Sequence, residues 1–350
     1  MNYHRGRRAA RHAGAIESIP GEGPAMIAPR TMTLLAFASA LALLGVSGAS
    51  AQNYPTQTIR IVVPQSPGGL IDTTARLIQP HLERSLKQTV IVENRTGAAG
   101  VLGTDAVAKA APDGHTLLVV AGSLSVLPAT NPNLPYDTER DLAPVALLSK
   151  YAFLFVVNSQ VPAKTLPEFV ALAKKDPGKY NYATTGMAAL NHLATERLAA
   201  LAGIKLLHIP YRGGAPSVMA VVKGEAHLLA ISPQVTMPHI EAGSIRAIAT
   251  GGASRDKLLP NVPTVAEAGY PGYEAVSWVG LLAPGKTPKP IVDRINAAVN
   301  EAMRVPEVAD RIAKTGSEVG GGTPEAFRAM ISREIKEWTE VARAANITTK

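Results

Sequence analysis

Short apolar, β-branched runs alternate with segments of helical periodicity along most of the chain. Strands are predicted at residues 59–63, 89–93, 116–121, 145–149, 153–157, 182–184, 206–209, 227–231, 245–250 and 276–282. Helices are predicted at 72–86, 101–111, 166–175, 190–202, 216–223, 234–242, 288–303, 306–314 and 324–345, and residues 128–144 are predicted to form a loop. Repeated β-α-β units are typical of parallel strands with helices on both faces, so the pattern predicts an α/β protein.

The predicted strands are too many for one small open sheet. A length of 350 residues is also typical of about two domains. The pattern therefore predicts two α/β lobes joined by crossing strands, with a cleft between them. We expect residues 52–152 plus 276–350 to form the first lobe and residues 153–275 the second. Ligands of such sheets bind beyond the carboxyl ends of the strands, so the residues after each strand are the informative ones.

The N-terminal region has the pattern of a secretory leader. Arg30 precedes an apolar run at residues 34–46, and small residues in an A-x-A arrangement end at Ala51. The run spans about 20 Å as a helix, which is too short for a bilayer core of about 30 Å. We predict export and cleavage near Ala51, with residues 1–51 as the leader, and the spacing favours translation from Met26 over Met1.

Composition excludes several classes of chemistry. The chain has no cysteine, which removes thiol nucleophiles, disulfides and thiolate metal sites. Aromatic residues make up 5%, few for a protein that stacks sugars or single-stranded nucleic acid. The net charge of +8 includes no long basic run, so no nucleic-acid partner is expected. H-E-x-x-H and G-x-S-x-G are absent, and neither a metal nor a cofactor is predicted.

A glycine-rich loop follows the first predicted strand. It contains Gln65, Ser66, Gly68 and Gly69, and the helix begins at about Asp72. Adjacent glycines let backbone N–H groups approach a ligand, and a helix N-terminus attracts anions. Asp72 is interpreted either as a helix cap or as a partner for a ligand ammonium group. A plain tight turn is the structural alternative for this loop.

The next two strand ends carry weaker signals. Gly97, Gly100 and Gly103 follow the second strand in a G-x-x-G-x-x-G spacing, which is not the dinucleotide-binding pattern. Arg95 in this loop either neutralises an acidic ligand or pins the loop, and the second role is favoured. Ser123 follows the third strand and is predicted to face the cleft.

Hydroxyl groups gather at one strand end of the second predicted lobe. Thr184, Thr185 and Gly186 precede a helix that contains His192, and together they form a second candidate anion cradle. His192 either donates to the ligand or holds the loop from behind, and the structural role is favoured.

Residues 280–287 satisfy the phosphate-loop pattern G-x-x-x-x-G-K-T, but the context does not fit. Pro284 removes a backbone donor, and Pro288 and Pro290 place the helix start after Thr287. We therefore interpret the match as chance.

The strand-end loops occur in a recognisable order. The stretches are IRIVVPQSPGGLIDTTAR, VIVENRTGAAGVLGT, PDGHTLLV, LPYDTERDLAPVALL, YNYATTGMAALNHLATE, IPYRGGAPSVMAVVKGE, EAGSIRAIAT and LPNVPTVAEAGYPGYEAVSWVGLLAPGKTPKPIV. Over residues 53–345 the chain resembles the Bug family of periplasmic solute-binding proteins, the receptors of tripartite tricarboxylate transporters.

The resemblance implies a two-lobed periplasmic-binding-protein (Venus-flytrap) fold with two mixed sheets flanked by helices. It also implies a monomeric receptor in the periplasm that binds a small carboxylate or related amide and presents it to transporter membrane subunits. The residues it assigns to the ligand are Gln65, Ser66, Gly68, Gly69, Asp72, Ser123, Thr184, Thr185, Gly186 and His192. The chain departs from the family pattern at Gln65, Ser66, Ala189 and His227, so the ligand's identity does not carry over.

Two rival functions remain open at this point. The first is a ligand-sensing partner of a membrane sensor kinase, and the second is an enzyme on the same scaffold, for which Ser66, Asp72, Ser123 and His192 are the available groups. Gln65 and the lack of an obvious Arg clamp favour a monocarboxylate, an amide or an amino acid over a tricarboxylate.

Overall fold

The computed structural model describes residues 54–348, whose strands form two mixed sheets, one of six strands and one of five. The predicted leader and its cleavage position lie outside the described residues. The six-stranded sheet contains, in spatial order, β11 (Glu318–Val319), β4 (Leu142–Ala152), β10 (Val276–Pro284), β3 (Thr116–Ala121), β1 (Ile59–Val63) and β2 (Val90–Asn94). The five-stranded sheet contains β7 (Leu207–Pro210), β6 (Asn181–Thr184), β8 (Leu228–Ile231), β5 (Leu154–Asn158) and β9 (Ile245–Thr250).

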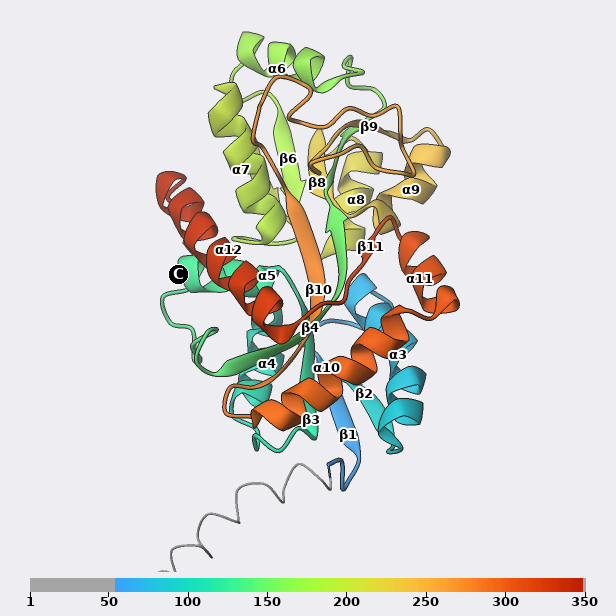
Figure 1. Ribbon diagram of the computed structural model, residues 1–350. Coiled ribbons are helices and arrows are strands. Elements are labelled where there is room, and N and C mark those ends of the chain that lie inside the picture. Colours follow the sequence, from blue (N-terminus) through green and yellow to red (C-terminus); the bar gives the residue numbers. More distant parts are fainter. Residues whose placement is uncertain (1–53, 349–350) are drawn as a thin grey trace, which may run out of the picture. The chain divides into compact units, whose positions relative to one another are not determined.

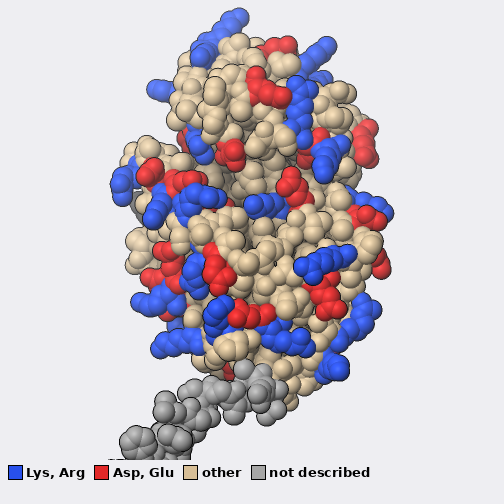
Figure 2. Space-filling view, in the orientation of Figure 1, with Lys and Arg blue, Asp and Glu red and all other residues tan. Residues whose placement is uncertain are grey.

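Helices cover both faces of each sheet, as β-α-β connections require. On the larger sheet, α3 (Leu70–Leu86) and α10 (Lys289–Met303), with α11 (Pro306–Ala313) beside them, pack on one face, and α4 (Val101–Ala108), α5 (Ser123–Thr130) and part of α12 (Pro324–Ala344) on the other. On the smaller sheet, α6 (Leu166–Lys175) and α7 (Leu190–Ala202) cover one face, and α8 (Gly214–Val222) and α9 (Pro233–Glu241) the other. Figure 1 shows these layers, and Figure 2 shows basic and acidic side chains interspersed over the same face of the molecule.

Most predicted elements agree with the structure, and the exceptions have local causes. The predicted loop at 128–144 is wrong at both ends, because α5 occupies Ser123–Thr130 and β4 already begins at Leu142. Helix α5 carries an internal proline, Pro128, and lacks a clear apolar stripe, so its periodicity is weak. The phosphate-loop match lies in β10 and the turn after it, where Gly280 packs against Phe327 and gives no phosphate cradle.

The last helix connects the two lobes. Its first half packs with the larger sheet through Phe327, Met330 and Ile331. Its second half contributes Trp338 and Ala342 to the core of the smaller sheet. Helix α12 runs beside α5 and reaches toward α7 (Figure 1). The predicted first lobe includes residues 276–350, whereas α12 contributes side chains to the cores of both sheets. The residue boundaries of the two lobes stay a prediction.

The crossing strands set the carboxyl edges of the two sheets opposite each other. Strand β10 is antiparallel to both β3 and β4, so β4 runs in the same direction as β3. Strand β1 is parallel to β3 and therefore also runs in that direction. One residue, Phe153, separates the end of β4 from the start of β5. Leu154 then pairs with Ile231 and Thr250, the last residues of β8 and β9. The chain therefore passes from the carboxyl edge of one sheet directly to the carboxyl edge of the other.

Three passes of the chain are hydrogen-bonded to one another at this junction. Phe153 N donates to Ala275 O at 2.9 Å, Gly251 N donates to Phe153 O at 2.8 Å, and Ala275 N donates to Gly251 O at 2.8 Å. A Cβ at Gly251 would lie 2.8 Å from Ala275 O and 2.9 Å from Ala275 Cβ. The junction is therefore a closely packed backbone cluster that accepts no side chain at residue 251.

Gly251→Ala tests this packing. We expect it to lower the free energy of unfolding by about 1–3 kcal/mol, because the added methyl group must push Ala275 away. Gly214→Ala is the control, since a Cβ there meets Ile231 Cδ1 at 3.4 Å and lies in the first turn of α8. Urea unfolding followed by circular dichroism measures both, and equal stability of the two variants would contradict the expectation.

Candidate functional site

The loop after β1 leads into a helix with no side-chain cap. Residues 65–69 are exposed, and α3 begins at Leu70 with Gly69 at its N-cap position. Gly68 has φ 83°, a left-handed conformation that favours glycine. The N–H groups of the first helical turn therefore point out of an exposed loop that has no side chain at residues 68 and 69. This arrangement presents backbone donors to an anion.

Asp72 holds this loop from behind. It is 2% exposed and accepts hydrogen bonds from Gly68 N at 2.9 Å, Asn94 Nδ2 at 2.9 Å and Arg76 Nε at 3.1 Å. Burial opposes ionisation of Asp72, but the hydrogen bonds from Arg76, Gly68 and Asn94 outweigh it and hold its pKa below the usual value. Of the two sequence interpretations, the contacts favour a cap-like positioning role, because the carboxylate oxygens are already occupied.

Sequence reasoning missed the partners of Asp72. Arg76 also donates from Nη2 to Asn94 Oδ1 at 3.0 Å, and Asn94 Nδ2 donates to Gln65 O at 3.0 Å. The two side chains thus connect the end of β2 to the loop after β1. The spacing Asp72–Arg76 (i, i+4 in a predicted helix) was the one signal that would have found Arg76.

The loop after β6 has the same plan with different chemistry. Thr184 is fully buried, and its Oγ1 donates to Gly186 O at 2.9 Å and lies 2.7 Å from His208 Nε2. Because the Thr184 proton is used on Gly186, His208 Nε2 is assigned as the donor in that second bond. Thr184 therefore builds the loop, whereas Thr185 and Gly186 are half-buried and remain accessible.

His192 supports this loop from behind, in agreement with the favoured interpretation. Its Nδ1 accepts from Ala188 N at 3.1 Å, and Ala188 has φ 57°, an unfavourable value for alanine. The rings of His192 and His208 stack with centroids 3.8 Å apart, and Tyr182 stacks on His208 at 5.0 Å. Burial lowers the pKa of His192 to about 4, with His208 adding to the effect, and burial also lowers the pKa of His208 to about 4.

Asn191 positions Thr185 at the start of α7. Asn191 Oδ1 accepts from Thr185 Oγ1 at 3.1 Å, and its Nδ2 donates to Ala230 O at 3.0 Å. Helix α7 begins at Leu190, with no side-chain cap at Ala189. Among the described α-helices, α6 and α12 are capped by the side chains of threonines 165 and 323, whereas α4, α5, α8, α9, α10 and α11 lack such a cap, as α3 and α7 do. The two loop helices thus keep their N-terminal donors free of side-chain caps.

Direct contacts place the start of α7 close to the end of β3. A Cβ at Gly122 would lie 3.4 Å from Leu190 Cδ2, and Ser123 follows Gly122 as the first residue of α5. A second contact joins the turn after α11 to the start of α9, because a Cβ at Gly316 would lie 2.5 Å from Pro233 Cβ. The strand-end loops of the two lobes therefore surround the junction at which the carboxyl edges meet.

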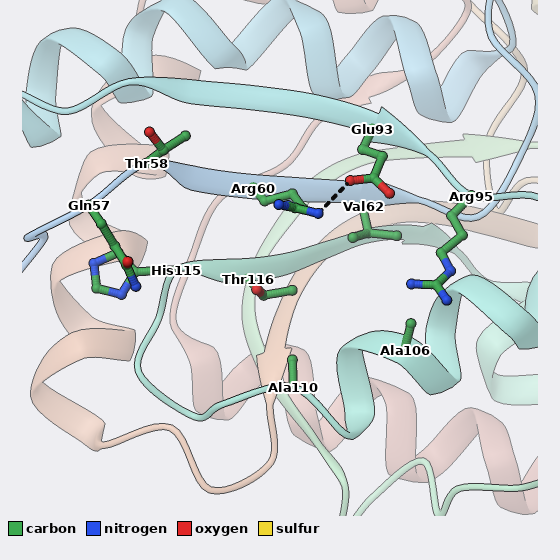
Figure 3. Close-up of a pocket in the computed structure, with 10 residues that line it drawn as sticks. All are labelled: Gln57, Thr58, Arg60, Val62, Glu93, Arg95, Ala106, Ala110, His115 and Thr116. Carbon is green, nitrogen blue, oxygen red and sulfur yellow. Dashed lines mark hydrogen bonds and ion pairs between the residues drawn. The ribbon is translucent and has the colours of Figure 1, made fainter.

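The two interpretations of Arg95, a partner for an acidic ligand or a residue that pins the loop, both stay predictions. Its backbone N donates to Val63 O at 2.8 Å, whereas its guanidinium lines a pocket of about 310 Å³ on the α4 face of the larger sheet. Figure 3 shows Arg60 pointing toward Glu93, with Nη1 and Oε2 2.9 Å apart, and Arg95 reaching over the same pocket. The pocket extends to Thr58 and Thr116 at the amino ends of β1 and β3, away from the junction.

The four groups that an enzyme on this scaffold would have to use do not pair with one another. Ser66, Asp72, Ser123 and His192 share no hydrogen bond with one another, and His192 Nδ1 and both Asp72 oxygens are engaged elsewhere. Residues 54–348 contain no cluster of three or more His, Asp or Glu able to hold a metal. No helix in the described part of the chain has both the length and the apolar character needed to cross a bilayer.

The sequence profile of the tripartite tricarboxylate transporter family receptor matches residues 74–347. The chain belongs to this family. It is 37% identical over 289 residues to a protein encoded in the tcbD–tcbE intergenic region of Pseudomonas sp. strain P51, covering 82% of this chain and 86% of the relative. It is 35% identical over 303 residues to Protein BugT of Bordetella pertussis, covering 86% and 93%. Members are periplasmic solute-binding receptors, and the family is not an enzyme family.

Solved structures of the same two-lobed fold include proteins with bound acids. The Rhodopseudomonas palustris protein Rpa4515 with adipate superposes with a TM-score of 0.78 at 31% identity, covering 85% of this chain and 99% of that one. MatC of the same organism, with bound malate, has a TM-score of 0.73 at 33% identity, covering 82% and 99%. The periplasmic binding protein BugD has a TM-score of 0.76 at 31% identity, covering 85% and 100%. The predicted family and the two-sheet fold are confirmed.

The stacked histidines predict how stability depends on pH. Their folded-state pKa of about 4 lies below the usual 6.5, so the unfolded chain binds more protons in this window and stability falls as pH falls from 6.5 to 4. Each imidazole contributes a slope of up to about 1.4 kcal/mol per pH unit. We expect His208→Gln, which keeps a donor for Thr184, to flatten the slope by up to that amount in urea unfolding at stepped pH. An unchanged slope would show that His208 does not have a lowered pKa in the folded protein.

Proposed function

We propose that this receptor captures a small carboxylate or related amide between residues 66–69 and residues 184–186, in the cleft between its lobes. The supporting observation is that two loops with uncapped helix N-termini stand at carboxyl edges that the junction sets opposite each other. A carboxylate loses hydration worth several kcal/mol on binding, and hydrogen bonds must replace it. Family members bound to adipate and malate support the acid class.

The side chains have different roles in this proposal. Gly68 and Gly69 admit the acid to the backbone donors of α3, and Gln65 and Ser66 form the exposed wall beside them. Thr185 rotates its hydroxyl from Asn191 to the ligand, and Gly186 leaves room for it. Ser123 borders the cleft where α7 approaches. Asp72, Thr184 and His192 act as positioning residues.

Binding from both lobes stabilises the closed arrangement, because a ligand that bridges two lobes binds that state better. A membrane protein can recognise the closed receptor. We propose that the chain is exported to the periplasm as a monomer and delivers its ligand to the membrane subunits of a tripartite transporter, in line with its family.

Two substitutions test the two-loop site. Gly69 has φ −76° and a Cβ there meets only Ser66 O at 3.8 Å, so Gly69→Val keeps the loop conformation while blocking access to the backbone.

Native mass spectrometry of protein from a periplasmic extract, followed by a thermal-shift screen of carboxylates, identifies the ligand. A ligand at 100 times its Kd stabilises the fold by about 2.7 kcal/mol.

We expect Gly69→Val and Thr185→Ala each to weaken binding in calorimetry by at least about tenfold, since the first blocks access to the backbone donors and the second removes a hydroxyl donor. Thr165→Ala is the control. It deletes the cap of α6 and costs about 1 kcal/mol of stability, but it should leave affinity unchanged. Wild-type affinity in both site variants would show that the ligand binds elsewhere.

Export predicts a defined mature N-terminus. When the chain is produced from Met26 in a Gram-negative host, intact-mass analysis of the periplasmic fraction should give a protein that begins at Gln52. Ala51→Arg should block processing, because the cleavage site requires a small residue. A periplasmic protein that retains residues before 52 would contradict cleavage after Ala51.

A further inference from the structure

The pocket that Arg95 lines contains none of the residues of the two-loop site. It has a volume of about 310 Å³ and lies on the α4 face of the larger sheet, with β1 as its floor. The end of β2 forms one wall and α4 the other (Figure 3). Ala106 and Ala110 have only methyl side chains, so the wall on the α4 side leaves the floor uncovered. The molecule therefore has a second concavity outside the cleft, of the size that small-molecule sites have.

Polar side chains with no protein partner stand at the two ends of this pocket. At one end, here called the hydroxyl end, lie Gln57, Thr58 and Thr116, whose side chains form no hydrogen bond with any described residue. At the other end, the Arg95 guanidinium has neither a hydrogen bond nor an ion pair in the described part of the chain. Figure 3 shows it pointing into the pocket above Ala106. All four groups are exposed or half-buried, so a ligand can reach them.

An ion pair occupies the centre of the pocket. Arg60 Nη1 and Glu93 Oε2 are 2.9 Å apart, and the two side chains are about half exposed (53% and 40%). The two charges of this pair cancel, and no other acidic side chain among the described residues lines the pocket. The lining therefore carries one uncompensated positive charge, on Arg95, which matches a ligand with a single negative charge.

His115 closes the hydroxyl end as a fixed wall. Thr56 N donates to its Nε2 at 3.1 Å, and its ring packs against Tyr54 with centroids 5.2 Å apart. Its Nδ1 lies 3.3 Å from Oδ1 of Asp113, which does not itself line the pocket. Because both ring nitrogens face neighbours in the same chain, the ring shapes the pocket and leaves ligand binding to the groups of the hydroxyl end.

The two ends differ in the ligand groups with which they pair. A guanidinium binds a carboxylate through two parallel N–H···O bonds. Hydroxyl and amide groups both donate and accept, so the hydroxyl end matches hydroxyl groups of a ligand. A plain aliphatic acid would displace water from that end without replacing its hydrogen bonds. A second acid group would find no second unpaired cation in the pocket.

The spacing of the two ends sets the length of this ligand. Thr58 and Val62 are four residues apart along the extended chain of β1 and the residue before it, a distance of about 13 Å. Arg95 follows Asn94, which pairs with Val63, and its side chain turns back over the pocket (Figure 3). An extended chain of about six carbons, with a hydrogen bond at each end, suits this span.

We infer that this pocket is a second binding site, outside the cleft, for a polyhydroxylated monocarboxylate, a sugar acid of about six carbons. Its carboxylate pairs with Arg95, and its hydroxyl groups bond to Gln57, Thr58 and Thr116. The inference goes beyond the proposed function and does not depend on it. It gives Arg95 an acidic ligand in a pocket separate from the two loops.

Calorimetry with three compounds of equal chain length tests the site. D-gluconate carries both the acid and the hydroxyl groups, hexanoate carries the acid alone, and sorbitol carries the hydroxyl groups alone. The titrated protein is the full chain with Gly69→Val, in which the proposed cleft site is blocked. We expect one gluconate molecule per chain, bound about tenfold or more tightly than hexanoate or sorbitol, because only gluconate satisfies both ends.

Two substitutions added to this chain separate the ends. Arg95→Gln should weaken gluconate binding about tenfold and change sorbitol binding less than about twofold, since it removes only the cation. Thr116→Val, which keeps the shape and removes one hydroxyl, should weaken gluconate binding about threefold or more and change hexanoate binding less than about twofold. Neither side chain has a partner to lose in the described residues, so both variants should fold normally.

Arg304→Gln is the matched control. Arg304 is also exposed and has no side-chain partner in the described residues, but it follows α10 on the opposite face of the larger sheet. This variant should bind gluconate as tightly as the Gly69→Val chain to which it is added.

Three results would overturn the second site. They are no binding of gluconate, equal binding of the three compounds, and gluconate binding that survives both Arg95→Gln and Thr116→Val. The third would show that gluconate binds elsewhere on the chain. None of them decides the two-loop function, which has its own test in Gly69→Val and Thr185→Ala with the ligand found in the periplasmic extract.

Discussion

The direct passage of the chain between two sheet edges is the constraint on which the site depends. With one residue between β4 and β5, the lobes have no freedom to meet in another way than carboxyl edge to carboxyl edge. The hydrogen bonds among Phe153, Gly251 and Ala275 hold the outgoing crossing at Phe153 and the return crossing at Ala275 in the same place. Every loop that follows a parallel strand is then directed toward this junction, including both glycine-bearing loops.

The two loops reach similar shapes through different chemistry. The first is held by an ionised carboxylate whose pKa is lowered by three hydrogen-bond donors, so it keeps its structure in mild acid. The second is held by two neutral, stacked imidazoles, one of which must stay unprotonated at Nδ1 to accept from Ala188. Protonation of His192 Nδ1 would therefore remove the acceptor for Ala188 N in the second loop.

Periodicity was sufficient to predict most elements, because apolar faces of strands and helices repeat with different spacing. It failed for α5, where Pro128 and a uniform apolar content remove the helical stripe. The candidate loops were found from glycines and hydroxyls, but their inner partners were not. Asn94, Asn191 and His208 come from other strands and helices, and tertiary packing alone brings them to the loops.

Roles within a motif proved harder to predict than the motif itself. Thr184 and Thr185 are adjacent, yet strand alternation turns the first side chain inward to His208 and leaves the second accessible. The charge of Asp72 is paired with Arg76. The glycine loop therefore presents backbone N–H dipoles to a ligand and no free charged group. In the proposed function these dipoles replace the hydration of a carboxylate without a buried countercharge, which suits a receptor that must release its ligand again.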